Sequence, residues 1–332
     1  DAVLRQPGGC FEQASSSNYP NVMVMSYLEQ NQAAKPEVVE RATRFLDEGY
    51  KILVGYETKE KGYEWFGGAP GHEALTAYGI MEFEDMAKVY DVDRQMIDRT
   101  AAWLLSRRDG QGGYKRNDRA LDSFGRASAG TTDAYITWAL AEAGHNKDIA
   151  RELDKQRELG AATRDPYLLA MAANTALKVA PEAETTRAML KRLAEIQGKD
   201  GDFPGAEQSI TMSGGESLAI ETSSLAVLAL VRGSPKGEYG DAIRKGVTWL
   251  SGHRNGWGAF GSTQGTVLAL KALTAYAEFS RQTRSSGAAS VLVNGTVVGQ
   301  FSYEEGHKET IELKNVGSAL KRSQQRRHVW PM

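Results

Sequence analysis

Residues 165–180 read DPYLLAMAANTALKVA, a run that is apolar or small almost all the way round when drawn as a helix. A helix of that composition has no polar face to turn toward water, so we expect it in the protein interior. The run PEVVERATRFLDEGYKIL (residues 36–53) instead separates an apolar face from a charged face, which is typical of a surface helix. The chain therefore contains two kinds of helix, internal and external.

These helices are arranged in a repeat. A helix ends, a Gly-rich aromatic loop follows, and a helix rich in Ala and Leu begins; the loops read KGYEWFGG (61–68), DGQGGYKRN (109–117), KDGDFPG (199–205) and RNGWGAFGS (254–262). Thr131, Glu221 and Ser262 are predicted to start three of the helices, because their side-chain oxygens can accept from free N–H groups in a first turn. A repeat of this kind predicts stacked helical hairpins that bury a shared face.

The helical pattern extends from the apolar run at Val22 to about residue 280 and accommodates roughly eleven helices. Hairpins that pair an internal with an external helix close into two concentric layers. We therefore predict an all-α fold, an α/α toroid of helical hairpins like that of terpenoid cyclases. This domain is expected to occupy residues 1–284.

The pattern changes after residue 284. The segment ASVLVNGTVVGQFSYEEGHKETIEL (289–313) alternates in strand fashion around Asn294-Gly295, a strong two-residue hairpin signal. We interpret residues 285–316 as a β-hairpin segment of an adjoining β-rich domain. Residues 317–332 are basic and follow neither periodicity, which indicates an irregular tail.

Composition excludes several function classes. With 40 basic and 42 acidic residues, the charge balance gives no indication of a nucleic-acid partner. The single cysteine rules out an internal disulfide and a CxxC metal site, and nothing in the sequence calls for a metal or another cofactor. No apolar run is long enough to insert this segment into a membrane, and the N-terminus does not read as a signal peptide. Because the first residue is Asp1 rather than Met, we expect the chain to be part of a longer protein.

The single cysteine lies in an unusual place, behind the Pro7-Gly8-Gly9 turn and three residues before Gln13. A free cysteine is most often a buried, inert apolar residue, and that alternative stands beside the following one. A thiol and a carboxamide three residues apart at a helix start can meet side chain to side chain. Attack of Cys10 on the Gln13 carboxamide, with loss of ammonia, would close a ring through a thioester.

The full motif, Pro7-x-Gly9-Cys10-x-Glu12-Gln13, resembles the thioester signature of the α2-macroglobulin and complement family. Phe11 stands where that signature most often has Gly, and in this respect the chain is similar to bacterial α2-macroglobulins. NVMVMSYLEQN (21–31) resembles the family's first helix, and TQGTVLALKAL (263–273) resembles the last helix of its thioester domain. The likeness covers residues 7–313, and the family's fold for this domain is the toroid.

The resemblance implies the thioester-containing domain of a bacterial α2-macroglobulin-like protein, a broad-spectrum protease inhibitor and not an enzyme. Its partners would be attacking proteases, captured covalently through lysine amines, and other domains of the same full-length chain. Its compartment would be periplasmic or extracellular, where foreign proteases arrive.

The resemblance also implies roles for individual residues. Cys10 would supply the thioester sulfur and Gln13 the acyl carbonyl, with Gly9 and Glu12 as supporting positions; Glu12 could equally be a carboxylate that complements the helix dipole. Asp122 falls where complement members that favour hydroxyl targets have a His, and no His occurs between His72 and His145. The resemblance therefore implies direct reaction with amines. Tyr114, on the same loop as Asp122, is expected to shield the thioester.

The alternative is an α/α-toroid enzyme, either a cyclase or a hydrolase that uses Cys10 as nucleophile with His72. His72-Glu73 lacks the second His of a zinc-protease motif, so a histidine in a loop or at a helix start is the simpler interpretation.

Overall fold

A computed structural model of the chain describes residues 3–31, 36–117, 119, 123–256, 258–280, 286–293 and 296–304. The chain divides into two compact units, Asp1–Tyr276 and Ala277–Met332. In the described residues, eleven α-helices and one short 3-10 helix precede two strands. The helices are α1 (Phe11–Asn31), α2 (Pro36–Val54), α3 (Glu73–Met86), α4 (Arg94–Ser106), η1 (Ser123–Gly125), α5 (Ala129–Glu142), α6 (Ala150–Ala162), α7 (Pro166–Val179), α8 (Glu184–Ile196), α9 (Gly215–Arg232), α10 (Gly240–Gly252) and α11 (Thr263–Ser280).

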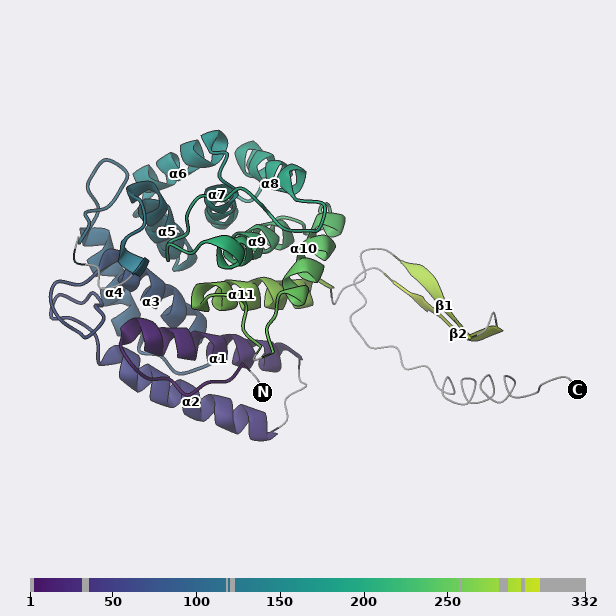
Figure 1. The fold of residues 1–332 in the computed structure, drawn as a ribbon, viewed down its shortest axis with the longest axis horizontal. Helices are drawn as coiled ribbons and strands as arrows, with labels where there is room; N and C mark the ends of the chain where they lie inside the picture. Colours follow the sequence, from purple (N-terminus) through teal and green to yellow (C-terminus); the bar gives the residue numbers. More distant parts are fainter. Residues whose placement is uncertain are drawn as a thin grey trace, which may run out of the picture. The chain divides into compact units, whose positions relative to one another are not determined.

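The helices of the first unit form two layers (Figure 1). Helices α3, α5, α7 and α9 are buried over most of their circumference, and together with α1 and α11 they make the inner layer. Helices α2, α4, α6, α8 and α10 bury only one face each and lie outside. The predicted all-α toroid is confirmed, and the run at residues 165–180 that indicated an internal helix is α7.

Helix starts were predicted with mixed success. Ser262 precedes α11 and its Oγ accepts from the Gly265 N–H at 2.9 Å, as expected of an N-cap. The predictions for Thr131 and Glu221 are wrong: α5 is capped by Ser128, and Glu221 lies in the second turn of α9. An acidic or hydroxyl residue before an Ala- and Leu-rich run can start a helix or lie inside a buried one, and the local sequence does not distinguish the two positions.

Helix α1 begins at Phe11, eleven residues before the apolar run at Val22 that was expected to start it. Its first half is polar in sequence but packs against other polar groups. Asn18 donates to Glu82 of α3 at 2.9 Å, and Asn21 donates to the Arg5 carbonyl at 2.8 Å. Because these contacts satisfy buried polar atoms, the Ser-rich segment is helical although it lacks an apolar stripe.

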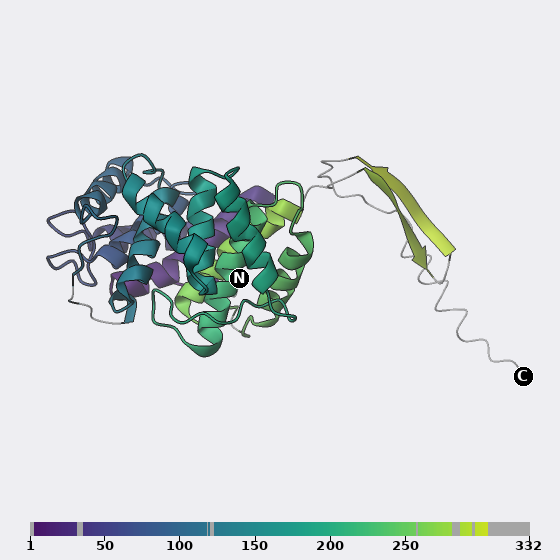
Figure 2. The ribbon, with the colours of Figure 1, turned by 90° about the horizontal axis from the view of Figure 1, so that it is seen from above.

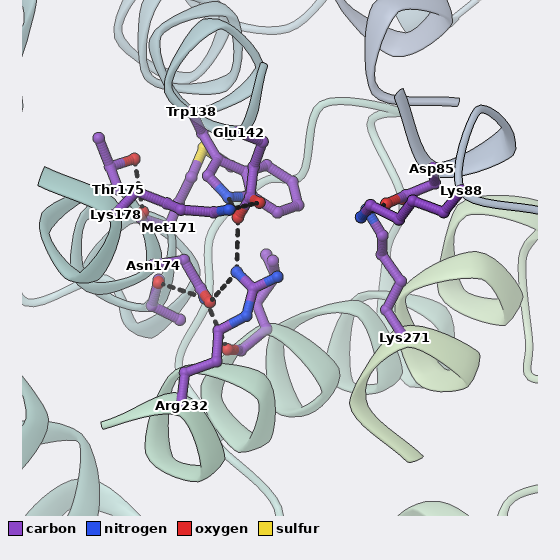
Figure 3. Close-up of polar contacts among 12 residues, drawn as sticks. Asp85, Lys88, Trp138, Glu142, Met171, Asn174, Thr175, Lys178, Arg232 and Lys271 are labelled. Carbon is purple, nitrogen blue, oxygen red and sulfur yellow. Dashed lines mark hydrogen bonds and ion pairs between the residues drawn. The ribbon is translucent and has the colours of Figure 1, made fainter. Parts of the chain in front are cut away.

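Charged side chains near the C-terminal ends of α3, α5, α7 and α9 form two groups of ion pairs (Figure 3). Glu142, at the end of α5, accepts from Lys178 of α7 at 3.2 Å and pairs with Arg232 of α9. Asp85 of α3 pairs with Lys271 of α11 at 2.6 Å. Burial alone would raise the pKa of Asp85, but the neighbouring lysines outweigh it and the pKa is lowered. These ends share one side of the toroid, so the inner helices run in the same direction, and the cations oppose the negative ends of their dipoles.

The second unit contains strands β1 (Gly287–Val293) and β2 (Thr296–Tyr303), which pair antiparallel from Gly287↔Tyr303 to Val293↔Thr296 (Figure 2). The predicted hairpin thus has its two strands; Asn294, Gly295 and residues 317–332 lie outside the described residues. Among the described helices, none is both long and apolar enough to cross a bilayer.

The α1–α2 contact gives a stability prediction. Gly49 lies inside α2, and a Cβ there would overlap Asn18 Oδ1 and stand 3.0 Å from Pro7 Cγ. Gly49→Ala is therefore expected to destabilise the fold by about 1–3 kcal/mol, measured by urea denaturation.

The matched control is Gly252→Ala at the end of α10, where an added Cβ meets nothing within 4 Å. The higher helix propensity of alanine is then the only difference, and the substitution is expected to be neutral or to stabilise by up to about 1 kcal/mol. Equal effects at both glycines would contradict the packing between α1 and α2.

Candidate functional site

Cys10 occupies the N-cap of α1. Its carbonyl accepts the first intrahelical hydrogen bond, from the Ala14 N–H at 2.8 Å, while the residue itself lies before the helix. The residue is 9% exposed, and its thiol is free in the described structure. The cysteine therefore sits at the positive end of a helix dipole with limited access to solvent.

Gln13 folds back over Cys10. Its Oε1 accepts from the Cys10 backbone N–H at 3.2 Å, so Gln13 takes the N3 position of a capping box in which the N-cap residue is cysteine. Gly9 makes room for this arrangement: its φ is +88°, and a Cβ there would overlap Oε1 and stand 3.1 Å from Cδ of Gln13. The helix cap thus places the Gln13 carboxamide against the backbone of Cys10; contact between the thiol and the carboxamide stays a prediction.

Phe11 anchors the start of α1 in the protein core. Its side chain is fully buried, with its ring 4.8 Å from that of Tyr63 and at right angles to that of Tyr56. Gly79 of α3 provides the space, because a Cβ there would lie 2.7 Å from Phe11 Cζ. The residue that departs from the usual motif is therefore a core anchor for the turn.

Tyr56 and Trp65 hold the turn by hydrogen bonds that the sequence did not reveal. Tyr56 Oη donates to the Gly9 carbonyl at 2.6 Å, and the Trp65 carbonyl accepts from the Phe11 N–H at 2.9 Å. Trp65 belongs to the loop KGYEWFGG, which sequence analysis identified only as part of the repeat. A contact between positions this far apart leaves no local pattern in the sequence.

Glu12 is half-buried on the side of α1 that faces the interior of the toroid. It accepts from Ser16 Oγ at 3.3 Å, and both side chains line a cavity of about 280 Å³. Its neighbour Gln13 is exposed. Two consecutive residues therefore point to different environments, one to the cavity and one to solvent.

Tyr114 lies against α5. Its backbone N–H donates to Asp133 at 3.2 Å, and its hydroxyl stands 3.5 Å from that of Thr137. Burial raises the pKa of Tyr114 well above its usual value. Tyr114 is thus held by α5 and by an antiparallel bridge to Arg108, and none of these contacts involves Cys10 or Gln13; Asp122 lies outside the described residues.

His72 is the N-cap of α3, which confirms the helix-start interpretation. Its Nδ1 accepts from the Leu75 N–H at 3.4 Å, and its ring packs edge-on against Trp65 at 5.0 Å. The nitrogen that could act as a base is thus already used for capping. In the described part of the chain, no three His, Cys, Asp or Glu side chains are grouped so that they could hold a metal ion.

Comparison with known proteins places these features in context. The family model described as the A-macroglobulin TED domain matches residues 1–276, the extent of the first compact unit. The chain is also similar to ovostatin from Gallus gallus, with 27% identity over 293 residues. That alignment covers 82% of this chain and 20% of ovostatin, so the chain spans about a fifth of the relative's length.

A buried carboxyl supports α1 close to the motif and gives a pH prediction. Burial raises the pKa of Glu82 from 4.5 to about 8, against hydrogen bonds from Asn18 and Ser15 that lower it. Between these two values the unfolded chain releases this proton while the folded chain keeps it. The contribution of Glu82 to stability is therefore complete below the unfolded pKa and is lost as the pH rises through 8.

Glu82→Gln is expected to remove that loss and to raise the free energy of unfolding at pH 8 by on the order of 2 kcal/mol. Urea denaturation of both proteins at pH 5 and pH 8 measures the difference. Glu40→Gln, at an exposed position of α2, serves as the control. The assignment fails if Glu82→Gln and the parent lose the same stability between these pH values.

Proposed function

The chain belongs to the A-macroglobulin TED domain family, and from that premise we propose that Cys10 and Gln13 form an internal thioester which captures attacking proteases covalently. We propose that the chain is the reactive domain of a protease-trapping inhibitor of the α2-macroglobulin type. The observation that carries the proposal is the Cys10 N-cap with Gln13 folded back over it, the carboxamide oxygen 3.2 Å from the cysteine N–H.

Formation of the bond balances as a condensation. The Cys10 sulfur adds to Cδ of Gln13, and the carboxamide nitrogen leaves as ammonia with the thiol proton. A thioester carbonyl has weak resonance stabilisation, so it is a stored acylating agent that lasts only where water and nucleophiles are kept away. Cys10 is 9% exposed, which supports storage of the sulfur side of such a bond.

Capture of a protease breaks the thioester bond again. An unprotonated lysine amine attacks Cδ, the bond from Cδ to sulfur breaks, and the nitrogen proton passes to the leaving thiolate. The N–H of Cys10, which donates to Oε1, is positioned to stabilise negative charge that develops on that oxygen. The exposure of Gln13 supports access of a large target.

Amines are the proposed nucleophiles because a neutral hydroxyl attacks a thioester slowly and no histidine lies between residues 72 and 145 to assist it. Each domain would react once, so the protein would be a stoichiometric inhibitor and not an enzyme. We further propose a bacterial origin, a periplasmic or extracellular location, and other domains of a longer chain as partners that keep the thioester covered. Similarity to ovostatin over a fifth of its length supports a role within a larger protein.

Intact-mass measurement tests the bond directly. The proposal expects a chain lighter than its encoded mass by one ammonia, which gains one methylamine on treatment and exposes one thiol. Glycerol at the same concentration should leave it unreacted. Cys10→Ala should show the encoded mass and take up no methylamine. Full encoded mass in freshly prepared protein, with no methylamine uptake at Gln13, would rule the thioester out.

Gly9 provides a second test. Gly9→Ala places a Cβ on the Gln13 side chain at a φ of +88°, so we expect the yield of thioester to fall by at least about tenfold. Gly8→Ala is the matched control, because an added Cβ there meets nothing within 4 Å. Thiol titration before and after methylamine treatment gives the yield. Equal yields in the two variants would refute the role assigned to Gly9.

A further inference from the structure

The cavity of about 280 Å³ that Glu12 lines lies at the N-terminal end of α11, beside α1 and the loop before α9. Its wall is mostly polar, and several of its polar atoms are buried. What such a cavity can bind depends on whether its free groups are hydrogen-bond donors or acceptors.

Three hydroxyls of the wall direct their protons to Glu221, and a fourth, that of Ser16, donates to Glu12. Ser213 Oγ donates to Glu221 Oε1 at 2.6 Å and Ser262 Oγ donates to the same oxygen at 2.7 Å. Thr211 donates at 3.2 Å. A hydroxyl has one proton and two lone pairs, so these groups present lone pairs to a ligand.

Gln264 also presents a hydrogen-bond acceptor to the cavity. The residue is 4% exposed and lines the cavity, and its Nε2 donates to Tyr135 Oη at 3.2 Å. Among the described residues, no hydrogen-bond donor reaches its Oε1. A buried carbonyl oxygen without a donor costs about 1–3 kcal/mol, which a ligand with an N–H group would recover.

The remaining wall is charged and aromatic. Glu12 contributes a carboxylate, and none of the nine residues described as lining the cavity is a lysine or arginine. Tyr78 and Phe124 stand side by side, with ring centroids 5.3 Å apart. Acceptor atoms, a carboxylate and aromatic faces together are the features that recognise an organic ammonium ion.

Helix N-termini would favour an anion at this end, but several of the N–H groups there already donate within the protein. The Gly265 N–H donates to Ser262 Oγ at 2.9 Å, and the Thr266 N–H donates to the Ser262 carbonyl at 2.9 Å. At α1, the Cys10 N–H is bonded to Gln13. The Glu12 carboxylate and the Gln264 Oε1 atom give the cavity the character of a cation site despite the helix dipoles.

We propose that this cavity is a non-covalent binding site for a primary alkylammonium group, held by the Glu12 carboxylate and Gln264 Oε1 with its alkyl chain along Tyr78 and Phe124. The binding itself needs no thioester. Because Glu12 and Gln13 are consecutive, a lysine side chain held here would lie next to the proposed acyl group; that consequence alone rests on the proposed function.

Isothermal titration of the full chain carrying Cys10→Ala with n-butylammonium chloride at pH 7.5 tests the site without covalent reaction. The expected result is saturable binding at one site, with no binding of n-butanol, which has the same length but no charge. Adding Glu12→Gln is expected to weaken the affinity at least about tenfold, because the ligand loses a charge-assisted hydrogen bond. Glu37→Gln, at the equivalent first-turn position of α2, is expected to leave the affinity unchanged.

Gln264→Leu is a second variant, expected to weaken binding by a similar factor, and circular dichroism establishes whether it folds. If it does not fold, the comparison of Glu12→Gln with Glu37→Gln decides the matter. Absence of saturable binding to the Cys10→Ala protein would overturn the proposal. So would equal binding of n-butanol, or an affinity that Glu12→Gln leaves unaltered. None of these outcomes bears on whether the parent protein forms a thioester.

Discussion

The turn that carries Cys10 depends on how the first inner helix begins. A helix start leaves backbone N–H groups without partners, and here one of them is satisfied by the side chain of Gln13 while Cys10 occupies the cap. This cap is held at a fixed place because Phe11, the next residue, is fully buried and donates its N–H to Trp65. Packing of a single aromatic side chain thus controls the mutual position of a thiol and a carboxamide. Without that anchor, the end of the helix would be free to fray and the two groups would separate.

The parallel inner helices give the two ends of the toroid opposite chemistry. At the C-terminal end, lysines and an arginine surround Asp85 and Glu142, so cations oppose the negative ends of the helix dipoles. At the N-terminal end, Glu12 and Glu221 lie beside hydroxyl groups, and Gln264 Oε1 has no donor among the described residues. One end is closed by charge pairs and the other keeps a polar cavity. The division follows from topology, because each outer helix returns the chain to the same end before the next inner helix starts.

Sequence analysis identified the architecture because composition separates the layers: a run such as residues 165–180 has no face for water, and α7 is buried accordingly. It also singled out Cys10 and Gln13, since spacing along a helix start is local information; their reaction with one another stays a prediction. It could not identify Tyr56 and Trp65 as partners of the motif, because contacts between residues about fifty positions apart leave no local pattern. Glu221 was misread as a helix start and the onset of α1 was placed too late. Both errors arise where polar residues are buried against polar partners, which a pattern of apolar spacing does not detect.

The side chain of Lys271 connects several inner helices. It is 10% exposed, pairs with Asp85, and its ammonium lies over the rings of Tyr19 and Trp138 at 5.2 and 5.8 Å. A single ammonium group thus contacts side chains of α1, α3 and α5, and it ties these three inner helices to α11.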